Sequence, residues 1–159
     1  MTESDSVKQI WQAYIDTVGE AAASGLNYTA WHFCDNESDA QELADLVNAG
    51  VKRATSSALW EYENDVDPIP CVGDYSVIID FHGNAQLIIK TTKVDIVPFN
   101  RVTEEFAAKE GEGDKSLAYW RKLHRDCFSR YIELYGLTFD DDMPVVCEQF
   151  DVIFPLDLV

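Results

Sequence analysis

The chain has 159 residues, of which 47% are hydrophobic and 12% are aromatic, and its formal net charge is -17 at pH 7. This length and apolar content exclude a disordered chain and a pair of ordinary domains, so we expect one domain over residues 1–159. The acidic balance disfavours tight non-specific binding to nucleic acid, which depends on Lys and Arg contacts with phosphates. A small-molecule ligand such as a nucleoside or nucleotide fits the charge better.

Basic residues fall in two groups along the chain, and if these groups converged on one cleft they could hold one or two phosphates. The first group is Lys52, Arg53, Lys90, Lys93 and Arg101, and the second is Lys115, Arg121, Lys122, Arg125 and Arg130.

The four cysteines are Cys34, Cys71, Cys127 and Cys147. They lack paired CxxC spacing, and no apolar signal segment begins the sequence, so we expect a reducing, cytoplasmic compartment with the thiols in the core. His32 and His124 lie near two of them without the close double-ligand spacing of a zinc site, so we predict no metal and no cofactor. We also expect no membrane association, because no apolar run approaches the roughly 20 residues of a membrane span.

Apolar residues recur at helical spacing over 7–18, after the capping-box pattern Ser6-Val7-Lys8-Gln9, which predicts a helix. The aromatic run 28–33 favours a short strand. A second capping box at Ser38 precedes a helix that Gly50 can end in a left-handed cap.

The remaining elements follow from changes in the period of the apolar residues. A two-residue turn at Gly83-Asn84 joins two strands with period two. The predicted elements are a short helix at 58–62, an exposed loop at 61–70, strands at 75–81 and 86–94, helices at 103–110 and 116–135, and a last strand at 145–154. We therefore expect an α+β fold with a strongly bent, mostly antiparallel sheet or small barrel and flanking helices.

The stretch Gly50 to Ser57 is a turn followed by a polar, hydroxyl-rich run. Lys52 and Thr55 lie in it, where a helix meets the strands, and Lys52 is the only lysine between Asp39 and Ile89. These two residues are candidates for chemistry. The alternative is that Lys52 only complements the helix dipole at the surface, as lysines near helix ends commonly do.

Several short motifs, in this order, resemble the ASCH domain. They are Gly50-x-Lys52-x-x-Thr55, Gly73-Asp74, Val102-Thr103-Glu104-Glu105 leading to Glu110, and Ser116-Leu117-x-Tyr119-Trp120-Arg121-x-x-His124. The resemblance spans roughly Trp31 to Phe154. It implies a PUA-like small β-barrel with a core at about 28–154 and an additional amino-terminal helix within 1–25.

The resemblance also implies an enzyme, because a small bacterial member of the family hydrolyses the amide of N4-acetylcytidine with a lysine, a threonine and a glutamate. These residues fall on Lys52, Thr55 and Glu110, with Glu112 as an alternative to Glu110. In such a mechanism burial would leave Lys52 neutral so that it can activate Thr55, and Glu110 with an elevated pKa would pass a proton to the leaving amine. Backbone amides between Gly50 and Thr55 could hold the oxyanion.

Six further residues are candidate contacts for the substrate: Trp31, Phe33, Arg53, Trp60, Trp120 and His124. Flat rings suit a pyrimidine, and we favour Trp60 among them. The alternative is structural, because aromatic residues beside sheet strands usually belong to the core and a histidine on an apolar helix stripe is usually a buried structural group.

Two other functions remain open. Related ASCH proteins include a ribonuclease and PUA-like barrels often bind RNA, so the resemblance also admits an RNA-binding or RNA-cleaving module with single-stranded RNA as partner. That function needs a concentrated basic groove and strong salt dependence. The other remaining function is that of a non-catalytic adaptor, which binds a ligand without turnover.

Overall fold

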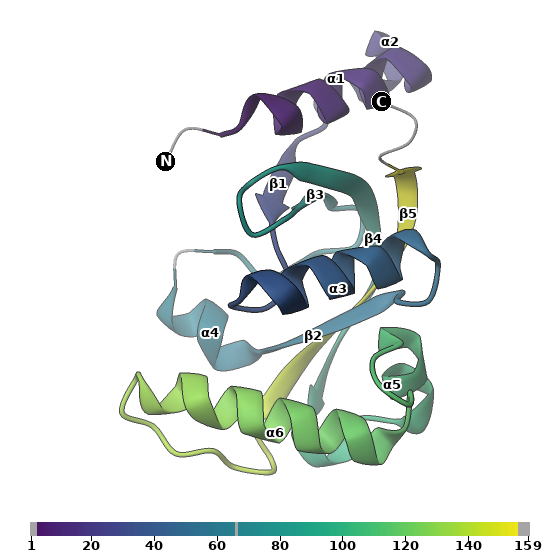
Figure 1. The fold of residues 1–159 in the computed structure, drawn as a ribbon. Coiled ribbons are helices and arrows are strands. Elements are labelled where there is room, and N and C mark those ends of the chain that lie inside the picture. Colours follow the sequence, from purple (N-terminus) through teal and green to yellow (C-terminus); the bar gives the residue numbers. More distant parts are fainter. Residues whose placement is uncertain (1–2, 66, 156–159) are drawn as a thin grey trace. The chain divides into compact units, whose positions relative to one another are not determined.

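The computed structural model describes residues 3–65 and 67–155. Figure 1 shows the elements of this part of the chain, in the order α1 Asp5–Val18, α2 Glu20–Ala23, β1 Tyr28–Trp31, α3 Glu37–Asn48, β2 Ala54–Ala58, α4 Leu59–Asn64, β3 Tyr75–Ile79, β4 Ala85–Pro98, the 3-10 helix η1 Phe99–Arg101, α5 Glu104–Glu110, α6 Leu117–Glu133 and β5 Pro144–Pro155. Among these helices, none combines the length and the apolar character needed to span a bilayer.

The five strands form one mixed sheet in the order β1-β3-β4-β5-β2. β1 pairs with β3 in parallel, whereas β3 pairs with β4 and β2 with β5 in antiparallel. The predicted α+β class with a bent, mostly antiparallel sheet and flanking helices is confirmed. The sheet is not closed into a barrel, because closure requires the first and last strands to pair, and the short strands β1 and β2 remain at its ends among the described residues.

The chain divides into two compact units, each built from separate segments. The first unit comprises Met1–Val51, Val72–Thr92 and Phe150–Val159, and the second comprises Lys52–Cys71 and Lys93–Gln149. Strands β4 and β5 contribute residues to both units. Neither unit is therefore one continuous stretch of the sequence.

The first unit buries two apolar clusters against β3 and β4. One cluster packs residues of α1 on the sheet: Val7, Ile10, Trp11, Val77, Ala85, Ile88 and Phe154. The other packs residues of α3: Phe33, Ala44, Val47, Ile78, Leu87, Ile89 and Phe150. The predicted helical stripes of the first and second helices thus face the core, as amphipathic helices require.

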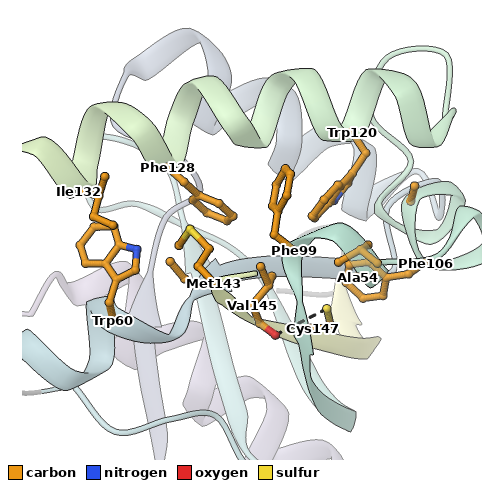
Figure 2. Packing of buried hydrophobic residues seen from close by; sticks show 13 residues of the cluster. Ala54, Trp60, Phe99, Phe106, Trp120, Phe128, Ile132, Met143, Val145 and Cys147 are labelled. Carbon is orange, nitrogen blue, oxygen red and sulfur yellow. Dashed lines mark hydrogen bonds between the residues drawn. The ribbon is translucent and has the colours of Figure 1, made fainter. Parts of the chain in front are cut away.

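The second unit has one apolar cluster, which lies between α6 and the strands (Figure 2). Its largest members are Trp60, Phe99, Phe106, Trp120, Phe128 and Met143. Phe99 packs on Trp120 with ring centroids 5.2 Å apart. The predicted apolar stripe of the long helix is confirmed, since Trp120, His124, Phe128 and Ile132 are its buried residues.

Three local predictions were wrong in detail. Helix α3 begins earlier than Ser38, because the Asn36 side chain accepts a hydrogen bond from the Asp39 amide at 2.9 Å and is the N-cap. Ser6 lies inside α1, and its Oγ accepts from the Ala85 amide at 2.9 Å. The turn between β3 and β4 is longer than two residues, because the Asp80 carboxylate accepts from the backbone amides of residues 82 and 84.

Candidate active site

Lys52 is positioned by the segment that enters β2. The backbone amide of its neighbour Arg53 donates to the carbonyl of Lys109 at 2.7 Å, which ties this segment to the last turn of α5. The Lys52 side chain is fully buried, with an exposed fraction of 0%. A buried ammonium requires a negative partner, because desolvation of an unpaired charge is costly.

That partner is Glu110, the last residue of α5. The Thr103 hydroxyl caps the start of this helix, and Gly111 ends it in the left-handed conformation with φ 70°. A carboxylate at a helix C-terminus is disfavoured by the helix dipole, so Glu110 depends on cations and hydrogen-bond donors around it.

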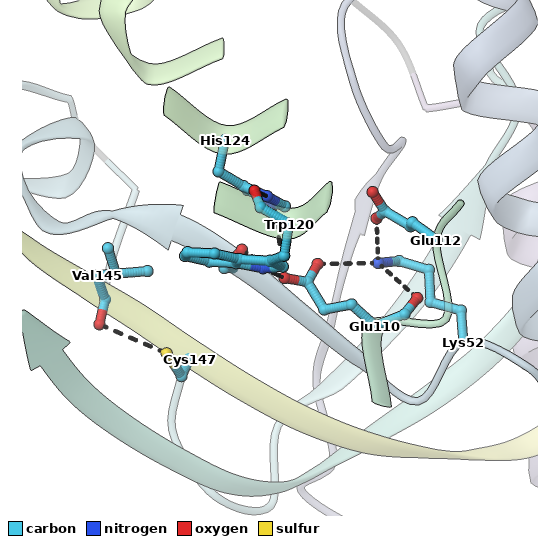
Figure 3. Close-up of polar contacts among 8 residues, drawn as sticks. Lys52, Glu110, Glu112, Trp120, His124, Val145 and Cys147 are labelled. Carbon is cyan, nitrogen blue, oxygen red and sulfur yellow. Dashed lines mark hydrogen bonds and ion pairs between the residues drawn. The ribbon is translucent and has the colours of Figure 1, made fainter. Parts of the chain in front are cut away.

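Lys52 bridges two carboxylates in the second unit (Figure 3). Its Nζ lies 3.1 Å from Glu110 Oε1 and 2.7 Å from Glu112 Oε1. The Glu110 side chain is 2% exposed and that of Glu112 is 13% exposed, so Glu112 is the member of the cluster nearer to solvent. The ammonium is thus held inside the protein by two acids.

The second oxygen of Glu110 accepts from two side chains. Ser56 Oγ donates to Oε2 at 2.7 Å, and the Trp120 indole Nε1 donates to the same atom. Together with Lys52 on Oε1, these donors satisfy both carboxylate oxygens, which is the condition for burying such a group.

His124 completes the cluster from the next turn of α6. Its ring stacks on Trp120 with centroids 4.3 Å apart, and its Nε2 lies 3.6 Å from Glu110 Oε2. Nδ1 is 2.8 Å from the Trp120 carbonyl, which can only accept, so Nδ1 carries a proton.

The environment determines the charge states of Lys52 and Glu110. Burial raises the pKa of Glu110, but attraction to Lys52 and His124 and the hydrogen bonds from Trp120 and Ser56 prevail and lower it below its ordinary value. Burial likewise lowers the pKa of Lys52, but Glu110 and Glu112 prevail and raise it. The predicted neutral Lys52 and high-pKa Glu110 are therefore wrong for this state, because each group stabilises the other's charge.

Three of these residues could in principle ligate a cation. Ligand atoms of Glu110, Glu112 and His124 lie within 4.8 Å of one another. The Lys52 ammonium already contacts both carboxylates, so the protein itself supplies the positive charge that they require. We assign no metal to this cluster.

Thr55, the predicted nucleophile, lies on β2 beside Ser56. Successive side chains of a strand point to opposite faces, so Thr55 is on the face opposite to Ser56 and its bond to Glu110. In the register with β5, Thr55 is paired with Glu148 and Ser56 with Cys147. The structure thus brings Lys52, Glu110 and Glu112 together, with Ser56 as the hydroxyl partner of Glu110.

The predicted substrate contacts are divided between several places. Trp120 and His124 contact Glu110 as described, and the Arg53 guanidinium lies 3.4 Å from the Lys52 carbonyl. Trp60 is buried in the apolar cluster of the second unit, where it packs against Tyr135 with centroids 5.0 Å apart. Its indole nitrogen has no hydrogen-bond partner among the described residues.

Trp31 and Phe33 belong to the first unit. Their rings pack edge to face, with centroids 4.9 Å apart, in the apolar cluster around α3. Phe33 is buried, which agrees with the structural alternative for these aromatic residues. Neither contributes to the cluster around Glu110 within the second unit.

Ser56 is the residue of this cluster that sequence reasoning missed. A signal for it exists, because residues 52, 54, 56 and 58 share a face if the chain is extended from Lys52 onward. The buried Ala54 and Ala58 on that face fit this pattern. The stretch has few apolar residues, so its period of two was not evident.

The second unit also has a pocket of about 240 Å³, whose lining does not include Lys52, Ser56 or Glu110. Apolar groups of Val97, Val102, Phe106 and Cys147 contribute to its lining, and its polar lining residues are Lys93, Asp95, Arg101, Thr103, Glu105, Lys109 and Gln149. Two members of the first predicted basic group, Lys93 and Arg101, therefore meet Lys109 of α5 here, though Lys93 is paired with Asp95 at 3.3 Å. Small-molecule sites are usually lined mostly by apolar groups, so this pocket is more polar than is typical.

Comparisons with known proteins identify the relatives of this chain. The family model of the ASCH domain matches residues 29–154. The crystal structure of an ASCH domain from Lactobacillus crispatus JV V101 is similar, with 35% identity, 97% of this chain and 98% of that chain covered, and a TM-score of 0.90. The protein EF3133 from Enterococcus faecalis V583 is 34% identical, with 94% and 89% covered and a TM-score of 0.84. No curated protein matches.

Proposed function

Because the chain belongs to the ASCH domain family, we propose that it is an amide hydrolase acting on a modified pyrimidine nucleoside such as N4-acetylcytidine. One observation carries the proposal. A buried ammonium, Lys52, and a buried carboxylate, Glu110, meet at 3.1 Å, and the carboxylate also accepts from a hydroxyl at 2.7 Å. Amide hydrolysis needs a base for the attacking O–H group and a cation for the oxyanion, and this pair offers both.

The charge states assign the roles differently from the lysine-base mechanism. Glu110 is ionised, so it is the group that can take a proton from an attacking hydroxyl or water and return it to the leaving amine. Lys52 is protonated, so it stabilises the negative charge that develops on the acyl oxygen. A lysine ammonium has three N–H donors, which here face Glu110 Oε1, the Glu110 carbonyl and Glu112 Oε1.

Glu112 is the partner that a substrate oxygen would replace. It is the more exposed acid, and it lies between Gly111 with φ 70° and Gly113 with φ 57°. A Cβ at Gly113 would meet the Tyr119 ring, so the short loop needs glycine at this position. A loop with two left-handed glycines can move its central side chain with little strain, which would free one Lys52 N–H for the acyl oxygen.

The pocket beside α5 supports a small substrate. Its volume of about 240 Å³ is below the roughly 300–1,000 Å³ of common ligand sites, which suits a small ligand, and Cys147 of its lining is the register partner of Ser56 on the neighbouring strand. Paired residues on neighbouring strands point to the same face, so the pocket and the Ser56 hydroxyl lie on one side of the sheet. The net charge of -17 also favours a nucleoside over a long RNA.

The test is a turnover assay of N4-acetylcytidine, with short single-stranded RNA assayed in parallel. Wild type is expected to release cytidine and acetate. Glu110→Gln and Lys52→Met should each lower kcat/KM by about 10²–10⁴-fold, the usual range for an acid–base group. Matched controls are Glu104→Gln on the exposed start of α5 and Lys122→Met on the exposed face of α6, which should retain wild-type rates.

Three results would contradict the proposal. Full activity of both cluster variants would remove Lys52 and Glu110 from the chemistry. RNA cleavage without nucleoside hydrolysis would favour the RNA-directed alternative. Binding of N4-acetylcytidine in calorimetry without any product would leave the non-catalytic adaptor.

A further inference from the structure

The Glu110 carboxylate has a hydroxyl partner that the ASCH motif does not assign. Ser56 Oγ donates to Glu110 Oε2 at 2.7 Å, the distance expected for a strong O–H···O⁻ bond. The carboxylate oxygen is therefore already in place to receive the serine proton. Among the described residues, Ser56 is the hydroxyl donor of this carboxylate.

Strand geometry separates Ser56 from the hydroxyls on either side of it. Ser56 lies on the face of the buried Ala54 and Ala58, whereas Thr55 and Ser57 lie on the opposite face. Ser57 Oγ lies 2.7 Å from the Tyr62 hydroxyl, which confirms that it points elsewhere. Only one of the three consecutive hydroxyls thus faces the Lys52 and Glu110 pair.

Ser56 is also more accessible than its partners. It is half-buried, while Lys52 and Glu110 are sealed at 0% and 1% exposure. Its register partner Cys147 lines the pocket, and directly opposed residues of antiparallel strands have Cβ atoms about 4.5–5.5 Å apart. Ser56 and Cys147 therefore lie side by side on the face of the sheet that borders the pocket.

We propose that Ser56, rather than Thr55, is the nucleophile of the amide hydrolysis; this inference rests on the proposed function. Ser56 Oγ attacks the acyl carbon, and its proton moves to Glu110 Oε2. The acyl C–N bond then breaks, Glu110 passes the proton to the N4 amine, and cytidine leaves. The acetyl group remains as an ester on Ser56 Oγ.

A second half-reaction restores the enzyme. Water attacks the ester carbon, and Glu110 takes a proton from that water. The ester C–O bond breaks, Ser56 Oγ receives the proton from Glu110, and acetic acid is released, so the sum is hydrolysis of one amide by one water. The Lys52 ammonium on the other oxygen of Glu110 lies beside the reacting group and neutralises the oxyanion in both steps.

The kinetic test compares the three consecutive hydroxyl residues. Ser56→Ala is expected to lower kcat for N4-acetylcytidine by at least about 10²-fold with KM nearly unchanged, because it removes a group needed only in the chemical steps. Ser57→Ala is the matched control and should keep the wild-type kcat. Wild-type kcat in Ser56→Ala, or a comparable loss in Thr55→Val with an active Ser56→Ala, would overturn the inference and leave the proposed function standing.

A second measurement does not depend on the stability of the alanine variant. Ser56→Cys keeps a nucleophilic atom at the same position, and incubation with N4-acetylcytidine followed by acid quenching should add the mass of one acetyl group at position 56, located by peptide fragmentation. Acetylation at Thr55, or at neither position in wild type and the cysteine variant while cytidine is released, would contradict a Ser56 ester. Absence of any cytidine release from wild type would remove the proposed function and this inference with it.

Discussion

The two units bury different kinds of polar group. Among the described residues of the first unit, the buried polar residues are the neutral Ser76 on β3 and Thr91 on β4, the strands on which α1 and α3 pack. In the second unit they are Lys52, Glu110, His124 and Glu148, which are all titratable. The first unit thus has a core whose energetics depend on apolar packing, whereas the second places ionisable groups in its interior.

This difference indicates where specialised chemistry resides. Burying an ion pair rarely adds stability over apolar residues of similar volume, because desolvation offsets most of the attraction. The buried Lys52 and Glu110, with His124 beside them, are therefore better explained by a site than by stability. Lys52 and Glu110 pair with each other and have shifted pKa values, which is a common mark of functional sites.

The largest expected effect is on the free energy of unfolding of Glu110→Ala. This change leaves the Lys52 ammonium with one carboxylate and removes the acceptor for Ser56 and Trp120, so we expect a loss of about 3–5 kcal/mol. Urea denaturation at neutral pH measures it. Glu104→Ala on the exposed first turn of α5 is the control and should stay within about 0.5 kcal/mol of wild type. A loss below about 1 kcal/mol for Glu110→Ala would show that the network is not tightly coupled.

In the first unit, Leu87→Ala should lower the free energy of unfolding through the loss of apolar packing alone. Leu87 is fully buried on β4, so its truncation removes buried surface and leaves a cavity, at a cost of about 2–5 kcal/mol. The loss for Glu110→Ala should shrink as the pH falls below 4.5, whereas the loss for Leu87→Ala should not, since no ionisable group of its cluster is changed. The same urea series, repeated at each pH, distinguishes the two variants.

The ion pair should also set a pH window for stability. The pKa of Glu110 is lowered from 4.5 on folding, so its contribution is present above that value and disappears as the pH falls through the folded-state pKa. The pKa of Lys52 is raised from 10.5, so its contribution is present below that value and disappears as the pH rises through the folded-state pKa.

The difference in unfolding free energy between wild type and Lys52→Met should therefore be largest between pH 4.5 and 10.5. Urea titrations across this range measure it. A difference that grows toward acid pH would contradict the ion-pair assignment.

The smallest effect is expected at the cap of α3. Asn36→Ala removes the bond to the Asp39 amide and should cost about 1 kcal/mol, whereas Asn36→Asp should retain most of the stability. Thermal unfolding of both variants checks this. Equal losses would show that the side-chain cap does not stabilise the helix.

Much of the fold could be predicted from the sequence, because its long periodic segments bury one face. The stripe that includes Trp120 and Phe128 predicted α6, and the acids after Thr103 predicted α5 and so placed Glu110 at a helix end. The open sheet could not be predicted in the same way. Whether β1 and β2 meet depends on strand pairing between segments far apart in the chain, which local patterns do not encode.

The residues of the candidate site were easier to predict than their charge states. Lys52 and Glu110 follow from the family motif. The directions of their pKa shifts, however, depend on how many carboxylates contact the Lys52 ammonium, and Glu112 is the second carboxylate that does so. Trp60, favoured as a stacking residue, lies in the apolar cluster instead. The contact of Ser56 with Glu110 requires the face of β2 to be known, and a polar run conceals that face.

The position of Cys147 has a consequence for chemical labelling. Burial, together with the negative charges of Glu110 and Asp95, raises the pKa of this thiol to about 12. Only the thiolate attacks maleimides or peroxide, so Cys147 should stay unmodified at neutral pH while the exposed Cys34 and Cys71 react. Labelling at Cys34 and Cys71 should therefore leave Cys147 unmodified, and a reaction of this sulfur near the carboxylate network would report an opening of the second unit.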